Sequence, residues 1–127
     1  MDDEPAYELT IDVETQYVPE QSYPEHNRYV FAYTITIENS GDIAAKLLNR
    51  HWIITDANNK VQEVRGEGVV GEQPYLPPGK SYRYTSAAVL ETPLGCMQGS
   101  YELVADDGVV FEAPIPVFRL TSSITLH

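Results

Sequence analysis

A long run of alternating residues between Arg28 and Glu38 constrains the fold more than any other stretch of the chain. Its large side chains (Tyr29, Phe31, Tyr33, Ile35 and Ile37) alternate with Val30, Ala32, Thr34 and Thr36. A period of two is that of a β-strand, and aromatic and β-branched residues favour strands. We therefore expect residues 28–38 to form a central strand.

The rest of the chain repeats this pattern between clusters of turn residues. Further strands are expected at residues 7–13, 47–55, 61–65, 80–90, 100–105 and 109–120, with loops at 19–27 and 91–99. Pro114 and Pro116 place the last strand at an edge or a bend. No window shows helical periodicity. The sequence predicts an all-β, immunoglobulin or fibronectin type III-like β-sandwich of about seven antiparallel strands. It forms one domain, 1–127, of which residues 1–6 are a flexible acidic tail.

The charge balance argues against several classes of function. Nineteen acidic and eight basic residues give a net charge of −11, and eight of the acids precede Arg28. Such a field repels nucleic acid and anionic lipid. The acidic first quarter could attract a basic partner or divalent cations, although a solvated strand surface explains it better. The start of the chain has no signal-peptide pattern and no apolar run spans a membrane, so we expect a cytoplasmic location.

No residue pattern points to catalysis, a metal or a cofactor. Cys96 is the single cysteine, and His26, His51 and His127 show no ligand spacing with it. Cys96 also has no lysine or arginine beside it in sequence to lower its pKa. Asp106 and Asp107, followed by Gly108, are explained by a turn. We predict a protein that is not an enzyme and that needs no cofactor.

The loop Arg65–Gly71 carries three glycines, Gly66, Gly68 and Gly71, in a Gly-x-Gly-x-x-Gly arrangement. Backbone amides in such a loop can bind a pyrophosphate, but a dinucleotide fingerprint needs a following helix. Three nearby prolines (Pro74, Pro77 and Pro78) prevent that helix, and no Walker lysine is present. Arg65 and Lys80 favour an anion, whereas Glu67 and Glu72 oppose it. We favour tight turns, a bulge or close packing over an anion site.

Leu94 and Met97 are the apolar residues of the expected loop 91–99. They form either an apolar contact for a protein partner or a cover over the end of the core. The sequence does not decide between these roles. Exposed strand edges also make a homodimer conceivable.

Several separated runs resemble the ApaG domain family in order along nearly the whole chain. They are residues 28–39, 64–74, 84–86, 92–99 (Thr-Pro-Leu-Gly-Cys-Met-Gln-Gly) and 114–120. The resemblance implies a fibronectin type III-like sandwich and no established activity. ApaG-like domains also occur in F-box proteins and a DNA-polymerase-interacting protein, which implies a protein-binding module. The family's association with cobalt and magnesium resistance and with diadenosine tetraphosphate metabolism identifies no ligand.

These observations predict a non-enzymatic β-sandwich module that mediates protein–protein interaction, with Leu94 and Met97 as partner contacts. The alternative is a site for a nucleotide or another pyrophosphate compound at Gly66, Gly68 and Gly71. That site could be linked to magnesium or cobalt homeostasis. The partner or ligand itself is left open by the sequence.

Overall fold

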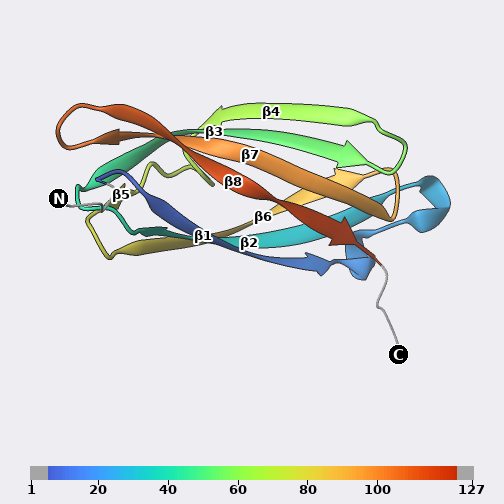
Figure 1. Ribbon diagram of the computed structural model, residues 1–127. Helices are drawn as coiled ribbons and strands as arrows, with labels where there is room; N and C mark the ends of the chain where they lie inside the picture. Colours follow the sequence, from blue (N-terminus) through green and yellow to red (C-terminus); the bar gives the residue numbers. More distant parts are fainter. Residues whose placement is uncertain (1–5, 123–127) are drawn as a thin grey trace.

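Two antiparallel β-sheets pack face to face in the computed structural model, which describes residues 6–122 (Figure 1). The three-stranded sheet has the order β1 (Leu9–Tyr17), β2 (Tyr29–Asn39) and β6 (Ser81–Leu90). The five-stranded sheet has the order β4 (Val61–Glu67), β3 (Ala45–Asp56), β7 (Leu94–Ala105) and β8 (Val110–Thr121). The two-residue strand β5 (Tyr75–Leu76) also pairs with β3. The predicted all-β sandwich is confirmed, with β5 as a short addition to seven longer strands.

The predicted loop 19–27 contains two short 3-10 helices, η1 (Pro19–Gln21) and η2 (Pro24–His26), each begun by a proline. Proline suits the first helical position because its missing N–H has no partner there. Within residues 6–122, no helix is long and apolar enough to cross a membrane. Ala6, the end of the predicted tail, accepts hydrogen bonds from the amides of Asp42 and Ile43. Residues 1–5 of that predicted tail lie outside the described part of the chain.

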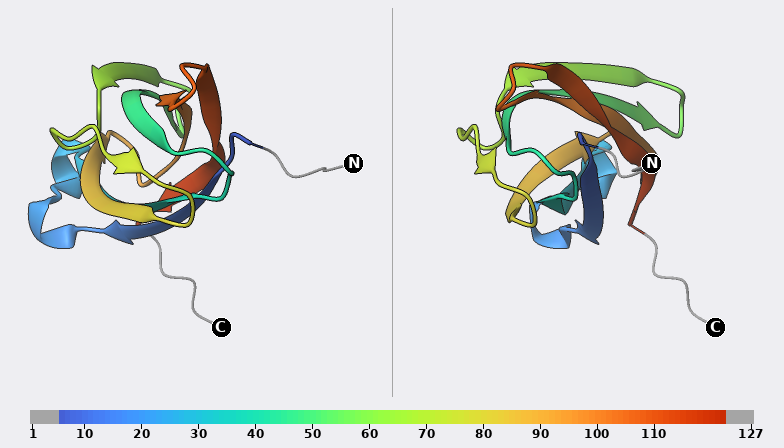
Figure 2. Two further views of the ribbon diagram at one scale, coloured as in Figure 1. Left: turned by 90° about the vertical axis from the view of Figure 1, so that its left-hand side faces the viewer. Right: turned by 60° about the vertical axis from the view of Figure 1, so that its left-hand side comes forward.

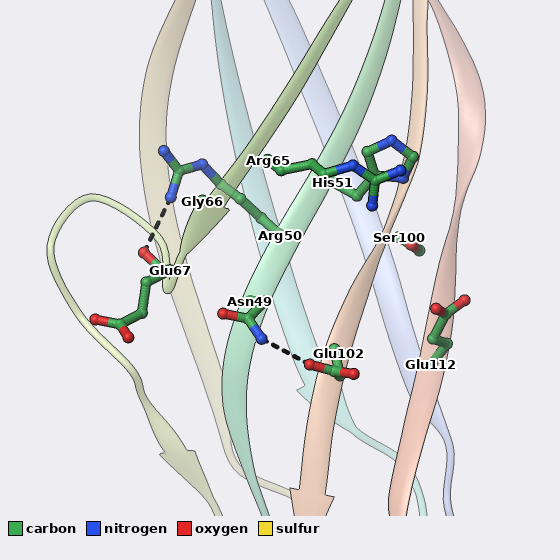
Figure 3. Close-up of a pocket in the computed structure, with 9 residues that line it drawn as sticks. All are labelled: Asn49, Arg50, His51, Arg65, Gly66, Glu67, Ser100, Glu102 and Glu112. Atoms are coloured by element: carbon green, nitrogen blue, oxygen red, sulfur yellow. Dashed lines mark hydrogen bonds between the residues drawn. The ribbon is translucent and has the colours of Figure 1, made fainter.

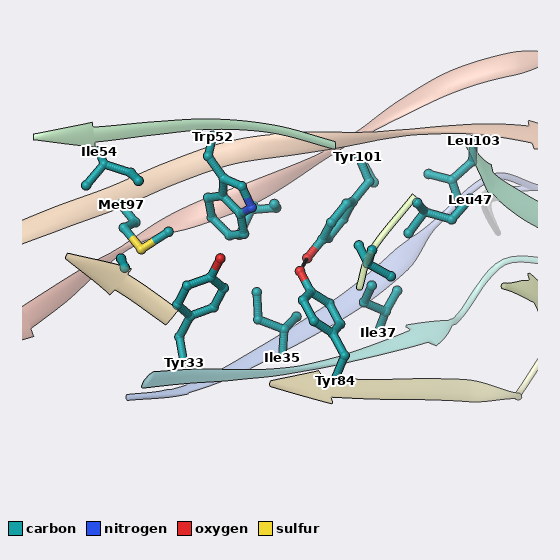
Figure 4. Packing of buried hydrophobic residues seen from close by; sticks show 14 of the residues in the cluster. Tyr33, Ile35, Ile37, Leu47, Trp52, Ile54, Tyr84, Met97, Tyr101 and Leu103 are labelled. Carbon is teal, nitrogen blue, oxygen red and sulfur yellow. Dashed lines mark hydrogen bonds between the residues drawn. The ribbon is translucent and has the colours of Figure 1, made fainter. Parts of the chain in front are cut away.

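The core lies between the inner faces of the sheets, where alternate residues of each strand point (Figure 4). Trp52 of β3 lies at its centre. The rings of Tyr33, Phe118 and Tyr101 pack edge-on around it, with centroid distances of 5.5, 5.8 and 6.4 Å from Trp52. These geometries are the favoured ones for aromatic pairs. The alternation that predicts the strands therefore also indicates which residues of each strand are buried in the core.

A buried hydroxyl pair connects the two sheets inside this core. Tyr84 of β6 and Tyr101 of β7 bring their hydroxyl oxygens to 2.5 Å (Figure 4). Both side chains are buried. Burial disfavours a phenolate and raises the pKa of each hydroxyl well above the usual value for tyrosine. The two hydroxyls are hydrogen-bonded to each other inside the core.

The predicted loop 91–99 is wrong from Leu94 onward, because residues 94–99 belong to β7. Two glycines of this stretch, Gly95 and Gly99, indicate a turn in the sequence but lie inside the strand. The pairing of β7 with β8 shifts its register between Met97 and Gly99. A Cβ atom on Gly99 would lie 2.0 Å from the carbonyl oxygen of His51 on β3. Gly99 is therefore required by the close approach of two strands.

Candidate functional site

The outer face of the five-stranded sheet carries two neighbouring rows of polar and charged side chains. Strand register places Arg65 of β4 opposite His51 of β3, and His51 opposite Ser100 of β7. The next row contains Glu67, Asn49, Glu102 and Glu112. Together the two rows line a shallow hollow of about 440 Å³ with basic groups toward one end and carboxylates toward the other (Figure 3). We call this the polar hollow.

Two basic groups of the polar hollow, those of His51 and Arg65, are already engaged by one carboxylate. Glu63 accepts hydrogen bonds from His51 Nε2 at 2.5 Å and from Arg65 Nη2 at 2.9 Å. The hydrogen bond with His51, followed by the charge of Arg65, holds the pKa of Glu63 below its usual range. At the other end Asn49 Nδ2 donates to Glu102 Oε1 at 2.6 Å. The hollow therefore offers no free cationic cluster for a phosphate.

Gly66 makes room for the side chain of Arg50. A Cβ atom at Gly66 would lie 2.7 Å from the guanidinium carbon of Arg50. That guanidinium donates to the carbonyl oxygens of Glu67 at 3.0 Å and Gly68 at 2.9 Å. Gly66 thus leaves space for the side chain of Arg50, which stabilises the end of β4 through these two hydrogen bonds.

The remaining glycines of the motif shape a turn that leaves the sheet edge between β4 and β5 and projects from the side of the sandwich (Figure 2). The amide of Val69 donates to Glu72 O at 2.8 Å, and the amide of Glu72 donates back to Val69 O at 2.9 Å. Gly68 has φ +63° and no room for a Cβ atom, which would lie 2.2 Å from Glu72 O. Gly71 has φ +82° within the turn. A turn or a close contact therefore accounts for each of the three glycines. This agrees with the interpretation of the motif as turns or close packing and not as an anion site.

The same contacts weaken the predicted pyrophosphate site at Gly66, Gly68 and Gly71. The amide of Gly68 donates to Leu48 O at 2.8 Å, and the amides of Val69 and Glu72 are engaged across the turn. Val69 is completely buried and its side chain joins the core. Two amides of the motif, and that of Glu72 directly after it, are thus bonded within the chain itself. Anion binding at this loop stays a prediction.

Val70, at the tip of the turn, has an unfavourable backbone conformation. Its φ is +42°, a left-handed value that β-branched residues rarely adopt, and its side chain is exposed. Asn-Gly is the preferred pair for such a two-residue turn. We expect Val70→Asn to raise the free energy of unfolding by about 1 kcal/mol, measured by urea denaturation. Val61→Asn, at an exposed valine of β4, is the control and is expected to give no gain. A neutral or destabilising Val70→Asn would contradict the strain at this turn.

A second hollow lies at the opposite end of the same sheet face, between β3, β7 and β8. It measures about 600 Å³ and its lining includes Leu94, Cys96, Val117, Phe118 and Arg119. Leu94 and Val117 are 44% and 61% exposed, which leaves two branched aliphatic side chains in contact with solvent. Strand register places Arg119 directly opposite Cys96. We call this the apolar groove.

The two predicted partner residues have different environments in the structure. Leu94 lines the apolar groove, whereas Met97 is completely buried and belongs to the core cluster. The core role that the sequence left open therefore applies to Met97, which presents no surface to a partner. Val117 and Arg119 were missed because only the pairing of β7 with β8 brings them beside Leu94 and Cys96. The alternating pattern of residues 109–120 could have shown that Val117 and Arg119 share a strand face, but prolines interrupt that pattern.

The other candidate groups have structural partners. Asp106 accepts a hydrogen bond from Tyr75 Oη at 2.7 Å, and Asp107 accepts one from Tyr7 Oη. The hydrogen bond from Tyr7 holds the pKa of Asp107 below its usual value. Among residues 6–122, no three His, Cys, Asp or Glu side chains lie close enough together to hold a metal ion. His127, a candidate from the sequence, lies outside the described residues.

These features define a β-sandwich module of the fibronectin type III kind with a polar hollow and an apolar groove on one open sheet face. Residues 19–105 match the model of the ApaG domain, and the chain belongs to the ApaG domain family. It is 56% identical over 124 residues to the protein ApaG of Azotobacter vinelandii, covering 98% of each chain. It is also 56% identical over 127 residues to the protein ApaG of Acidithiobacillus ferrooxidans, covering 100% of both.

A solved structure agrees with this assignment. The crystal structure of a Bordetella pertussis protein described as ApaA superposes with a TM-score of 0.92 at 51% identity, covering 96% of this chain and 99% of that one. The C-terminal domain of wzt superposes with a TM-score of 0.55 at 9% identity, covering 96% of this chain and 83% of that one, and shows the fold alone. The names of the ApaG relatives indicate no enzymatic activity.

Proposed function

We propose that this chain is a non-enzymatic module that binds a protein partner through the apolar groove. The observation that supports this most directly is the exposure of Leu94 and Val117 on two paired strands beside Phe118. Exposed aliphatic side chains around a concave surface are typical of interaction sites. The core already contains the larger apolar residues of both strands, so these two are not needed to close it.

The lining of the apolar groove indicates the chemistry of the partner. Leu94 and Val117 suit an apolar side chain of the partner, and Arg119 in the same lining supplies a donor for a carbonyl or carboxylate oxygen. The net charge of −11 favours a partner whose wider surface is basic, because the field of the whole molecule steers association. The partner is therefore a basic protein that presents an apolar anchor next to a hydrogen-bond acceptor.

The groups needed for nucleophilic catalysis do not come together in this groove. Cys96 has Arg119 opposite it, a neighbour that the sequence did not reveal, yet no histidine is among the residues that line the groove. His51, the histidine of the same sheet face, is engaged by Glu63. A nucleophile, a base and an orienting group are all required for the usual mechanisms. A binding role fits this arrangement better.

Substitution with aspartate at two similar valines of β8 tests the groove. Val117→Asp places a carboxylate at the groove, whereas Val110→Asp introduces the same change at the far end of the strand, where Val110 is 56% exposed. We expect Val117→Asp, and likewise Leu94→Asp, to reduce recovery of the bound partner about tenfold, as for loss of an apolar anchor. Recovery is measured by quantitative mass spectrometry of cross-linked complexes from cells of the source organism.

The Val110→Asp protein is expected to recover the partner as the unmodified protein does, and all variants are first checked for a native melting temperature. Equal recovery by Val117→Asp and the unmodified chain would contradict the groove as the binding site. Equal loss with Val110→Asp would show a general effect of negative charge.

Binding of a nucleotide or another pyrophosphate compound at Gly66, Gly68 and Gly71 is the second candidate function. Its remaining support is the projecting turn, where Val70 and Gly71 have left-handed φ values. Successive amides in a turn conformation can bind an anion. Titration with ATP or a dinucleoside polyphosphate, with and without magnesium, tests it through backbone amide shifts in NMR spectra. Localised shifts at residues 65–72 would support the site, and their absence at millimolar ligand would remove it.

A further inference from the structure

The edges of the two sheets differ in how they are protected against pairing with another strand. Charged residues, prolines and interruptions commonly block such edges. β4 carries three charged residues in Val61–Glu67, and β8 contains Pro114 and Pro116. β1 carries Asp12 and Glu14. β6 (Ser81–Leu90) has a single charged residue, Arg83, and no proline, so it is the least protected edge.

The free edge of β6 presents a regular row of backbone donors and acceptors. In an antiparallel pair, alternate residues turn their N–H and C=O groups toward the partner strand. The amide of Asn39 on β2 donates to Lys80 O, one residue before β6. The backbone N–H and C=O groups of the even-numbered residues of β6 therefore point toward β2. The odd-numbered residues, 81 to 89, therefore turn these groups outward. Gln62 Nε2 donates to Val89 O at 3.4 Å, which agrees with that orientation and covers one end of the row.

We propose that β6 is a homodimerisation edge, at which β6 of a second copy pairs antiparallel to form one six-stranded sheet. The second copy replaces the 3.4 Å hydrogen bond from Gln62 to Val89 O, so that all five outward residues pair. This fixes the register: Thr85 lies opposite its own symmetry mate, and Arg83 lies opposite Ala87 of the second copy. A two-fold axis at Thr85 makes each contact occur twice. Six strands is an ordinary size for a sheet.

The distribution of charge along β6 favours a second copy over a foreign strand. A self-pairing edge must avoid placing like charges opposite each other, because such pairs destabilise a sheet. Arg83 meets Ala87 in the proposed register, and its guanidinium is already paired with Glu14 of β1 at 3.3 Å. Three of the five side chains in this row (Ser81, Thr85 and Ala87) are small, so little bulk crowds the middle of the pair. An edge for a basic peptide would instead be expected to carry carboxylates.

Charge substitutions at Ala87 test the proposed register, because the register and the net charge predict opposite effects. Ala87→Glu puts a carboxylate opposite Arg83 of the second copy, while Ala87→Lys puts a like charge there. Two such cross-strand pairs change the dimer dissociation constant about 2- to 30-fold. We expect Ala87→Glu to tighten the dimer and Ala87→Lys to weaken it. Repulsion between two acidic molecules alone would give the reverse order.

Sedimentation equilibrium up to about 1 mM protein, in about 0.15 M NaCl, measures the dissociation constants. Gln16→Glu and Gln16→Lys are the matched controls. Gln16 is exposed on the other edge strand, β1, in the same row of the sheet as Ala32 and Ala87. The control pair is expected to follow net charge only. A monomer throughout this range would overturn the proposal, as would the order of affinities that net charge predicts at Ala87.

Discussion

Gly99→Ala is expected to lower the free energy of unfolding by about 4 kcal/mol or more, near the upper end of single-substitution effects. The added Cβ atom would lie 2.0 Å from the carbonyl oxygen of His51 and 3.2 Å from Cα of Trp52. Both neighbours belong to the backbone of β3, so no side chain can rotate away. Relief of the clash would separate β3 from β7 next to the central tryptophan. Urea denaturation followed by Trp52 fluorescence measures the loss.

Gly79→Ala is the control for this prediction. Gly79 has φ +82°, but an added Cβ atom would have no heavy atom within 4 Å. Its substitution therefore costs only the left-handed strain, about 1 kcal/mol. If Gly99→Ala costs no more than Gly79→Ala, the close approach of β3 and β7 is contradicted.

Gly99 also shows why part of the fold was not predictable from the sequence. The strand at 28–38 was found because its residues alternate and both of its faces contact other residues along its length. Gly95 and Gly99 interrupt the pattern of β7 in the same way that turn residues do. Their role depends on how closely β3 and Leu90 approach them, which is a property of strand pairing. The sequence therefore predicted the sandwich but began β7 too late.

The candidate sites were predictable only in part for a related reason. Alternation tells which residues share a face of one strand, but it does not give the register between strands. The apolar groove joins Leu94 to Val117 and Arg119, which lie more than twenty residues away along the chain, so Leu94 alone was found. The glycine motif is defined by sequence spacing alone, which does not determine the backbone conformation. In the structure its three glycines have three separate local roles.

Raising the pH from 9 to 11 is expected to lower the free energy of unfolding by about 3 kcal/mol, through the buried pair Tyr84 and Tyr101. Burial raises the pKa of both hydroxyls in the folded state, whereas in the unfolded chain tyrosine ionises near pH 10. A raised pKa in the folded state means that the stabilisation is complete below about pH 10. It is lost as the pH rises above 10, by about 1.4 kcal/mol per pH unit for each group. Urea denaturation at a series of pH values gives the slope.

The Tyr84→Phe/Tyr101→Phe double variant is the decisive comparison. Because it removes both hydroxyls, it leaves no buried group unsatisfied and is expected to be close to the unmodified protein in stability at pH 7. A single Tyr101→Phe leaves the Tyr84 hydroxyl without its partner and is expected to cost about 1 to 2 kcal/mol.

Tyr23→Phe, at a side chain that is 53% exposed, is the matched control and is expected to lose stability at alkaline pH as the unmodified protein does. Between pH 9 and 11 the double variant should lose clearly less stability than the unmodified protein. If it instead loses as much stability as the unmodified chain, the ionisation of this pair is not what limits the fold at alkaline pH.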